Sequence, residues 1–114
     1  MMNLAKKLLF EPARSLAFGS VGAAYMGIGT AFDKPIRLII LQNLTDEVIW
    51  LSFDGIEDHI PLASISYIIL DVTANKATEE GWFIGEGTRV YAKKLSGAPS
   101  SGAVYVSACY GKGL

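Results

Sequence analysis

Short apolar runs alternate with turn-forming residues along this chain, at a spacing of about eight to twelve residues that is typical of sandwiches and barrels. From residue 35 onward the runs are rich in β-branched and aromatic residues, which favour strands. The predicted strands are 36–41, 48–53, 64–72, 82–84, 88–94 and 103–110. Alternation within the last two places Val90 and Ala92 together on one face, and it places Val104, Val106 and Ala108 on an inner face. The pattern predicts an all-β fold: an antiparallel β-sandwich of jelly-roll-like or Greek-key type.

The segments between the runs predict how the strands connect. Residues 42–47 are polar turn material, and Asp54-Gly55 supplies a further turn because glycine tolerates positive φ. Consecutive strands are therefore expected to pair as an antiparallel meander. The glycine-punctuated stretches 14–21 and 24–32 are expected to pair as strands, while 73–81 is a polar link with room for one helical turn.

Residues 1–13 are expected to form an N-terminal arm, and residues 14–114 a single β-sandwich domain. In the arm, Leu4 and Leu8, together with Phe10, would line one side of a short helix. An isolated helix of this length is marginal in water, so it must lie on its own sandwich or on a neighbouring subunit. We expect the arm to contact a neighbour through its apolar side chains, Leu4, Leu8, Leu9 and Phe10.

The composition is apolar for a domain of 114 residues. Apolar residues make up 51% of the chain and charged residues 18%, with a mean hydropathy of +0.34. Soluble domains carry roughly 25% charged residues. Either the chain is a membrane protein, or other molecules cover part of its apolar surface.

The membrane interpretation fails on the longest uncharged stretch, 15–32, because glycine and other small residues dominate it. A signal peptide is not expected either, since only Leu8-Leu9-Phe10 separate Lys6-Lys7 from Glu11-Pro12. The sequence predicts an unprocessed protein that is made in the cytoplasm and has no membrane partner. The lone Cys109 excludes an internal disulfide and a multi-cysteine metal site.

The net charge of −1 conceals an uneven distribution. Residues 1–37 carry +3, residues 38–80 carry −7, and residues 81–114 carry +3. Segments of unlike charge can complement each other between subunits, which favours specific association. The alternative is that these charges only solvate loops. The two modest basic clusters do not predict direct recognition of nucleic acid.

Catalytic and metal-binding patterns are weak. His59 lies beside Asp58, but no nucleophile motif accompanies the pair, so we do not expect an enzyme or a cofactor. The acidic turn Asp54–Asp58 lacks the alternating spacing of a calcium loop, and we interpret it as an exposed acidic turn rather than a metal site. A sugar-stacking platform is an alternative function for the aromatic residues Trp50, Tyr67, Trp82, Tyr91, Tyr105 and Tyr110.

Several segments from Leu51 onward carry a family resemblance. They are Ser52-Phe53-Asp54-Gly55, Asp58-His59-Ile60-Pro61-Leu62, and the stretches 70–76, 87–93 and 97–108. This series resembles small β-sandwich virion proteins of tailed bacteriophages, especially short-tailed ones, over about the last two-thirds of the chain. The resemblance implies a structural component that is present in many copies, on the capsid or at the head–tail junction.

The leading hypothesis is therefore a virion structural protein that binds other copies of itself and docks on capsid, portal or neck proteins, as a decoration or neck-ring component. The alternative is a carbohydrate-binding module of a receptor-binding virion protein.

Overall fold

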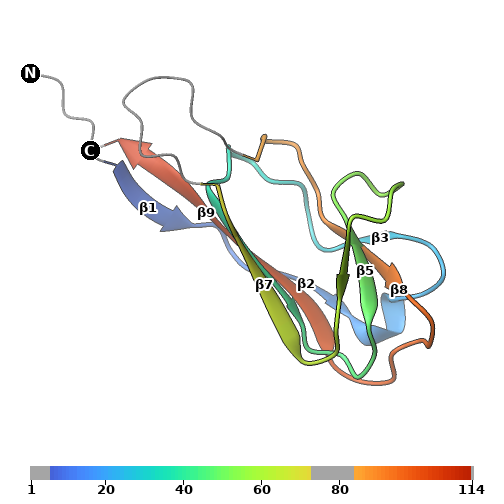
Figure 1. Cartoon of the computed structure of the whole chain (residues 1–114). Helices are drawn as coiled ribbons and strands as arrows, with labels where there is room; N and C mark the ends of the chain where they lie inside the picture. Colours follow the sequence, from blue (N-terminus) through green and yellow to red (C-terminus); the bar gives the residue numbers. More distant parts are fainter. Residues whose placement is uncertain (1–5, 73–83, 114) are drawn as a thin grey trace, which may run out of the picture.

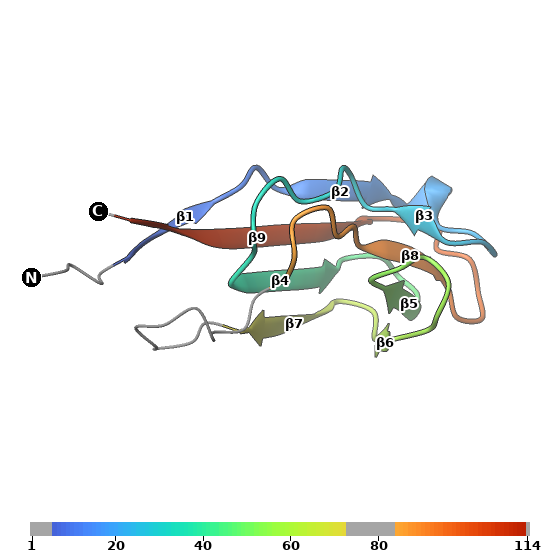
Figure 2. The same ribbon diagram turned by 90° about the horizontal axis from the view of Figure 1, so that it is seen from above.

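The computed structural model describes residues 6–72 and 84–113, which form two antiparallel sheets packed face to face (Figures 1 and 2). The five-stranded sheet contains β1 (Lys6–Phe10), β2 (Arg14–Ala17), β4 (Leu38–Asn43), β7 (Ser66–Asp71) and β9 (Ala103–Gly113). The four-stranded sheet contains β3 (Met26–Gly27), β5 (Ile49–Ser52), β6 (Ile60–Leu62) and β8 (Tyr91–Lys94). The all-β class and the antiparallel sandwich are thus confirmed.

The core lies between the two sheets and is built from alternate residues of the long strands. Ile39 and Leu41 from β4 meet Ile49 and Leu51 from β5, and all four side chains are inaccessible to solvent. The predicted inner positions Val104, Val106 and Ala108 are confirmed, because all three are inaccessible to solvent. Val90 and Ala92, which were predicted to share a face, are both buried.

β9 organises the larger sheet. It pairs with β4 along one side, and with β2 and then β1 along the other, where the chain breaks the edge at Glu11–Pro12. The half of β9 that pairs with β1 extends beyond the four-stranded sheet (Figure 2). The molecule is correspondingly long, with extents of 56 × 23 × 20 Å.

The helix predicted in the N-terminal arm is wrong from residue 6 onward, because Lys6–Phe10 is a strand of the sheet. Pairing with β9 satisfies the backbone groups of β1 that face this strand, whereas an isolated helix of this length gains too little from its own hydrogen bonds. Residues 2–5 of that prediction lie outside the described residues. The one described helix is the short 3₁₀ helix η1 (Phe18–Ser20), and no helix among the described residues is long and apolar enough to cross a membrane.

The predicted meander is also wrong, because 36–41 and 48–53 belong to different sheets. The connection between them is a corner in which Asn43 and Thr45 are buried, while Leu44 and Asp46 are exposed. The Nδ2 of Asn43 donates to the carbonyl oxygens of Glu47, Leu62 and Ala63 at 2.9–3.1 Å, and its Oδ1 accepts from the backbone and hydroxyl of Thr45. These bonds satisfy the turning backbone in the interior, so the chain can change sheets there.

The two glycine-punctuated stretches do not pair with each other either: β2 pairs with β9, and β3 pairs with β8. The sequence pattern also missed β6, which contains Pro61. Ile84 pairs with Ile36 through an isolated bridge, while the 73–81 link and residues 82–83 lie outside the described residues.

Candidate protein–protein interface

The face of the five-stranded sheet that points away from the core carries many apolar side chains among the polar residues Ser15, Gln42, Asp71 and Ser107. Its side chains follow from the register: Leu38 lies opposite Cys109, and Ile40 lies between Ser107 on β9 and Ile69 on β7. We call this surface the outer face. Its apolar members are Leu8, Phe10, Leu38, Ile40, Tyr67, Ile69, Tyr105 and Cys109.

Four of these side chains are strongly exposed. The exposed fractions are 49% for Leu8, 62% for Phe10, 64% for Tyr67 and 52% for Ile69. Half-buried Leu38 and Ile40 lie between the two exposed pairs, so the apolar surface is continuous across strands about 4.8 Å apart. Sandwich sheets that face water normally present polar residues on this side. A contiguous apolar patch on a small protein instead marks a site of contact with another molecule.

The predicted interface residues of the N-terminal segment divide between the two sides of β1. Leu8 and Phe10 belong to the outer face, while Leu9 is half-buried on the opposite side, beside Tyr110. Leu4 lies outside the described residues. The residues predicted from sequence therefore supply part of the outer face. The rest comes from β4 and β7, whose apolar outer positions resemble core positions in sequence.

Cys109 is buried within the outer face, between Phe10 on β1 and Leu38 on β4. Burial raises the pKa of the Cys109 thiol, which disfavours the nucleophilic thiolate. Its contribution is that of a small apolar residue.

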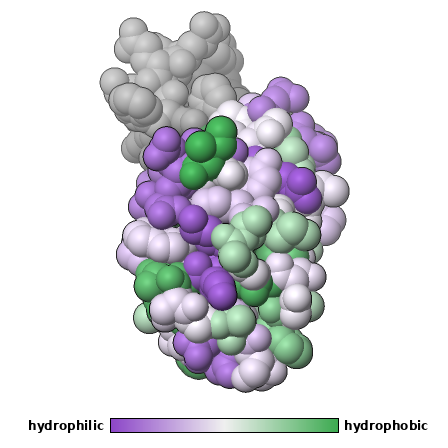
Figure 3. Space-filling model, turned by 90° about the vertical axis from the view of Figure 1, so that its right-hand side faces the viewer, coloured by the Kyte–Doolittle hydropathy of each residue, from purple (hydrophilic) through white to green (hydrophobic). Residues whose placement is uncertain are grey.

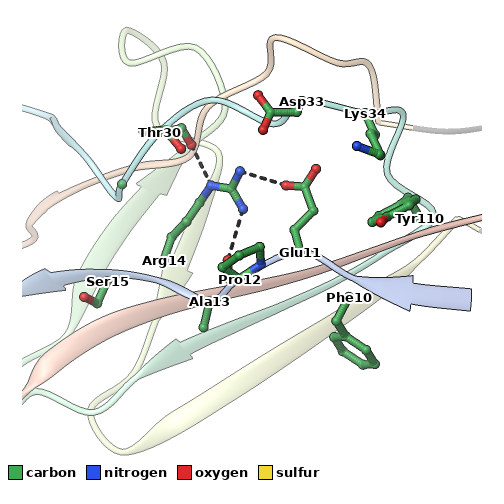
Figure 4. Close-up of a pocket in the computed structure, with 11 residues that line it drawn as sticks. Phe10, Glu11, Pro12, Ala13, Arg14, Ser15, Thr30, Asp33, Lys34 and Tyr110 are labelled. Carbon is green, nitrogen blue, oxygen red and sulfur yellow. Dashed lines mark hydrogen bonds and ion pairs between the residues drawn. The ribbon is translucent and has the colours of Figure 1, made fainter.

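A surface cavity of about 500 Å³ lies where β1 ends and β2 begins (Figure 4). Arg14 donates to the carbonyl oxygens of Thr30 and Ala31, lies 4.8 Å from the ring centre of Phe32, and pairs with Glu11. Glu11 Oε1 is held by this ion pair, and Oε2 has no hydrogen-bond donor among the described residues. The arrangement ties the 29–34 loop to the larger sheet and so positions Phe10 at the rim of the outer face.

The outer side of the four-stranded sheet carries a second cluster. Asp58 accepts a hydrogen bond from the Tyr25 hydroxyl at 2.6 Å and pairs with Lys93 at 3.1 Å, while the Lys93 ammonium lies 4.7 Å from the Tyr25 ring centre. Burial, followed by the bond to Asp58, raises the pKa of Tyr25, and that same bond is the main cause of a lowered Asp58 pKa. Figure 3 shows the end of the molecule nearest β3, β5 and β8, where hydrophilic and hydrophobic residues are interspersed.

The acidic turn after β5 is held by protein donors. Asp54 Oδ1 accepts from the backbone N–H groups of Ile56 and Glu57 and from the Ser52 hydroxyl, at 2.8–2.9 Å. These bonds lower the pKa of Asp54 to about 2. His59 closes the same turn, since its Nδ1 accepts the Phe53 backbone N–H at 3.0 Å. Within the described part of the chain, no group of three His, Cys, Asp or Glu side chains is placed to hold a metal ion.

The aromatic residues proposed for a sugar platform do not form one surface. Tyr67 and Tyr105 lie on the outer face, Tyr110 packs against the core, and Trp50 and Tyr91 lie on the outer side of the four-stranded sheet. Trp82 lies outside the described residues. Comparison with known proteins adds no further constraint, because no family model, curated protein or solved structure matches this chain.

Proposed function

We propose that this protein is a structural component of a multi-copy assembly, in which it binds other copies of itself and docks on a larger protein shell through the outer face. The observation that carries the proposal is the gathering of Leu8, Phe10, Tyr67 and Ile69 on one sheet surface, each about half exposed or more. Removing such surface from water stabilises a complex by roughly 25 cal/mol per Å².

In this proposal, charged residues in the two halves of the molecule orient neighbouring copies. Lys7 and Lys112 lie opposite each other on β1 and β9, at one end of the long axis. The acidic loop 53–59 follows β5, on the half of the molecule away from these lysines (Figure 1). Opposite charges in the two halves favour neighbouring copies whose long axes run antiparallel, because a basic end then lies beside an acidic loop.

The assembly we propose is the virion of a tailed bacteriophage, with capsid, portal or neck proteins as the docking partners. Support comes from the resemblance of the segments after Leu51 to small β-sandwich virion proteins. In this setting the protein is a decoration or neck-ring component. Mass spectrometry of purified particles tests the location, because hundreds of copies per particle indicate capsid decoration and about a dozen indicate a ring.

Sedimentation velocity of the purified full chain tests the association itself. We expect oligomers at micromolar concentration, and we expect Phe10→Ser and Ile69→Thr to shift the distribution toward monomers. Ile56→Ser is the matched control, because Ile56 is 78% exposed but lies in the loop after β5, away from the outer face. A wild-type chain that stays monomeric at high concentration and does not bind capsid or portal protein would remove the proposal.

A second candidate function is carbohydrate binding at the outer side of the four-stranded sheet. Trp50 lies opposite Lys93 on β8, and Tyr25 and Tyr91 lie close to that lysine, so aromatic rings surround a charged pair. Sugars bind surfaces of this type by stacking on rings and hydrogen-bonding to charged groups. A Trp82→Phe variant isolates the fluorescence of Trp50. A change on addition of glycans supports this function, and no change over a broad glycan panel excludes it.

A further inference from the structure

The edge of the larger sheet at β7 has no partner strand within residues 6–72 and 84–113. Among the described strands β7 pairs only with β4, and Figure 2 shows it at the margin of the sheet. The Val72 backbone N–H donates to the Arg37 carbonyl at 2.8 Å, so Val72 faces β4. Because strands alternate with a period of two, the N–H and C=O groups of Tyr67, Ile69 and Asp71 point away from the sheet.

The other sheet edges have features that hinder pairing with a strand from another chain, and β7 lacks these features. β6 contains exposed Pro61, β3 is two residues long, and the β1–β2 edge is interrupted at Pro12. β7 has the sequence SYIILD, with no proline or lysine, and it pairs with β4 without a bulge. Natural proteins rarely leave such an edge uncovered, because it accepts a strand from another chain. β7 is therefore the edge at which strand addition meets the fewest obstacles.

We infer that β7 pairs with β7 of a second copy of this chain, antiparallel and about a two-fold axis at Ile69. This inference rests on the proposed self-association and gives it a register. A second copy of the chain fits this edge because β7 is complementary to itself. In this register Ile69 lies opposite the partner subunit's Ile69, and Tyr67 lies opposite the partner subunit's Asp71. Each of these pairs exchanges two backbone hydrogen bonds.

The side chains suit the same register. Tyr67, Ile69 and Asp71 all project on the outer face and are exposed. The Tyr67 hydroxyl can donate to the partner subunit's Asp71, since a carboxylate accepts several hydrogen bonds at once. The two-fold axis creates this contact twice.

A shift of the axis to Ile68 is less favourable. It would place Ile65 opposite the partner subunit's Asp71, but Ile65 has φ of 52° and has left the extended conformation. This shift would also remove both pairs between Tyr67 and the partner subunit's Asp71. The Ile69 axis instead uses the whole extended stretch from Ser66 to Val72, and it joins the two outer faces into one continuous surface.

Disulfide trapping of the full chain in a Cys109→Ser background tests the register. Ile69→Cys places two sulfur-bearing residues at a Cα separation of about 5.5 Å, within the range of about 4.4–6.8 Å that a disulfide accepts. Tyr67→Cys is the matched control, because the two copies of residue 67 lie about 14 Å apart along the strands. We expect oxidation to cross-link Ile69→Cys into dimers, and to leave Tyr67→Cys and Asp71→Cys uncross-linked when each is alone. A mixture of Tyr67→Cys and Asp71→Cys chains should cross-link.

Blocking the edge gives an independent measurement. Ile69→Pro removes a backbone donor that points away from β4, so the ladder to β4 stays intact, and we expect the dimer to weaken about tenfold or more. Thermal unfolding checks that this variant is folded. Oligomers that form without the Ile69 cross-link overturn the register but leave the proposed function standing. A strictly monomeric wild-type chain overturns this inference, and it overturns the proposed function as well if it binds neither capsid nor portal protein.

Discussion

Glu11 and Arg14 form an ion pair, with 2.7 Å between Oε1 and Nη2, and both side chains are at least nine-tenths buried at the junction of β1 and β2. Removing one member of a buried pair leaves an uncompensated charge in the interior. We expect Arg14→Met to lower the free energy of unfolding by about 3–5 kcal/mol, measured by urea denaturation. The double variant Glu11→Gln/Arg14→Met should lose less than Arg14→Met alone, because no buried charge remains. Equal losses would show that the carboxylate is not the source of the cost.

Asn43 stabilises the corner between the two sheets through its side-chain amide. Its amide donates to three backbone carbonyl groups, and the residue is inaccessible to solvent. Asn43→Leu keeps a similar volume but removes one donor from each of these carbonyls, and it removes the acceptor of the Thr45 backbone N–H and hydroxyl. The loss should cost at least about 2 kcal/mol of unfolding free energy. Gln42→Leu, at the neighbouring half-buried position on the outer face, should change the urea midpoint little. Similar losses in both variants would argue against a special role for Asn43.

Ile65 is the one non-glycine residue with positive φ in the described part of the chain, and its side chain is 70% exposed. A β-branched residue in the left-handed region costs about 1–2 kcal/mol, whereas asparagine tolerates that conformation. We therefore expect Ile65→Asn to raise the free energy of unfolding of the monomer by about 1 kcal/mol. Denaturation at a concentration where the protein is monomeric measures this. A destabilised Ile65→Asn variant would contradict it.

The stability of the fold depends on pH through the carboxylate of Asp54. Its native pKa of about 2 lies below its ordinary value of 3.8 because three donors hold the carboxylate. A depressed native pKa stabilises the fold above pH 4, and this contribution is lost as the pH falls from 4 toward 2. We expect the urea midpoint of the wild type to drop over this window more steeply than that of Asp54→Asn. Parallel curves would mean that these hydrogen bonds do not contribute to stability.

The strands with clear alternation were predictable from sequence, and so was the class of fold. Val104, Val106 and Ala108 are apolar at every second position in a run of small and β-branched residues, and they are fully buried. Pairing between strands was not predictable, because it depends on groups that the pattern treats as turn material. Asn43 and Thr45 are polar in sequence and buried in the corner that sends the chain to the other sheet.

The composition of the outer face was only partly predictable for a related reason. Leu8 and Phe10 stood out because they lie in a segment with no predicted core partner, although the helix assigned to them was wrong. Ile69 is as apolar as its neighbours Ile68 and Leu70, and only the register with β4 separates the exposed residue from the half-buried ones. A run that is apolar at every position does not reveal which face is buried.

The position of β9 inside the larger sheet determines when this sheet can fold during synthesis. β1, β2 and β4 all pair with this strand, which is the last described one in the chain, so none of them has its full complement of hydrogen bonds until the ribosome has released Ala103–Gly113. A nascent chain that lacks these residues has no completed five-stranded sheet. A product that is truncated before Ala103 cannot complete this sheet, so β9 must be synthesised before the two-sheet fold can form.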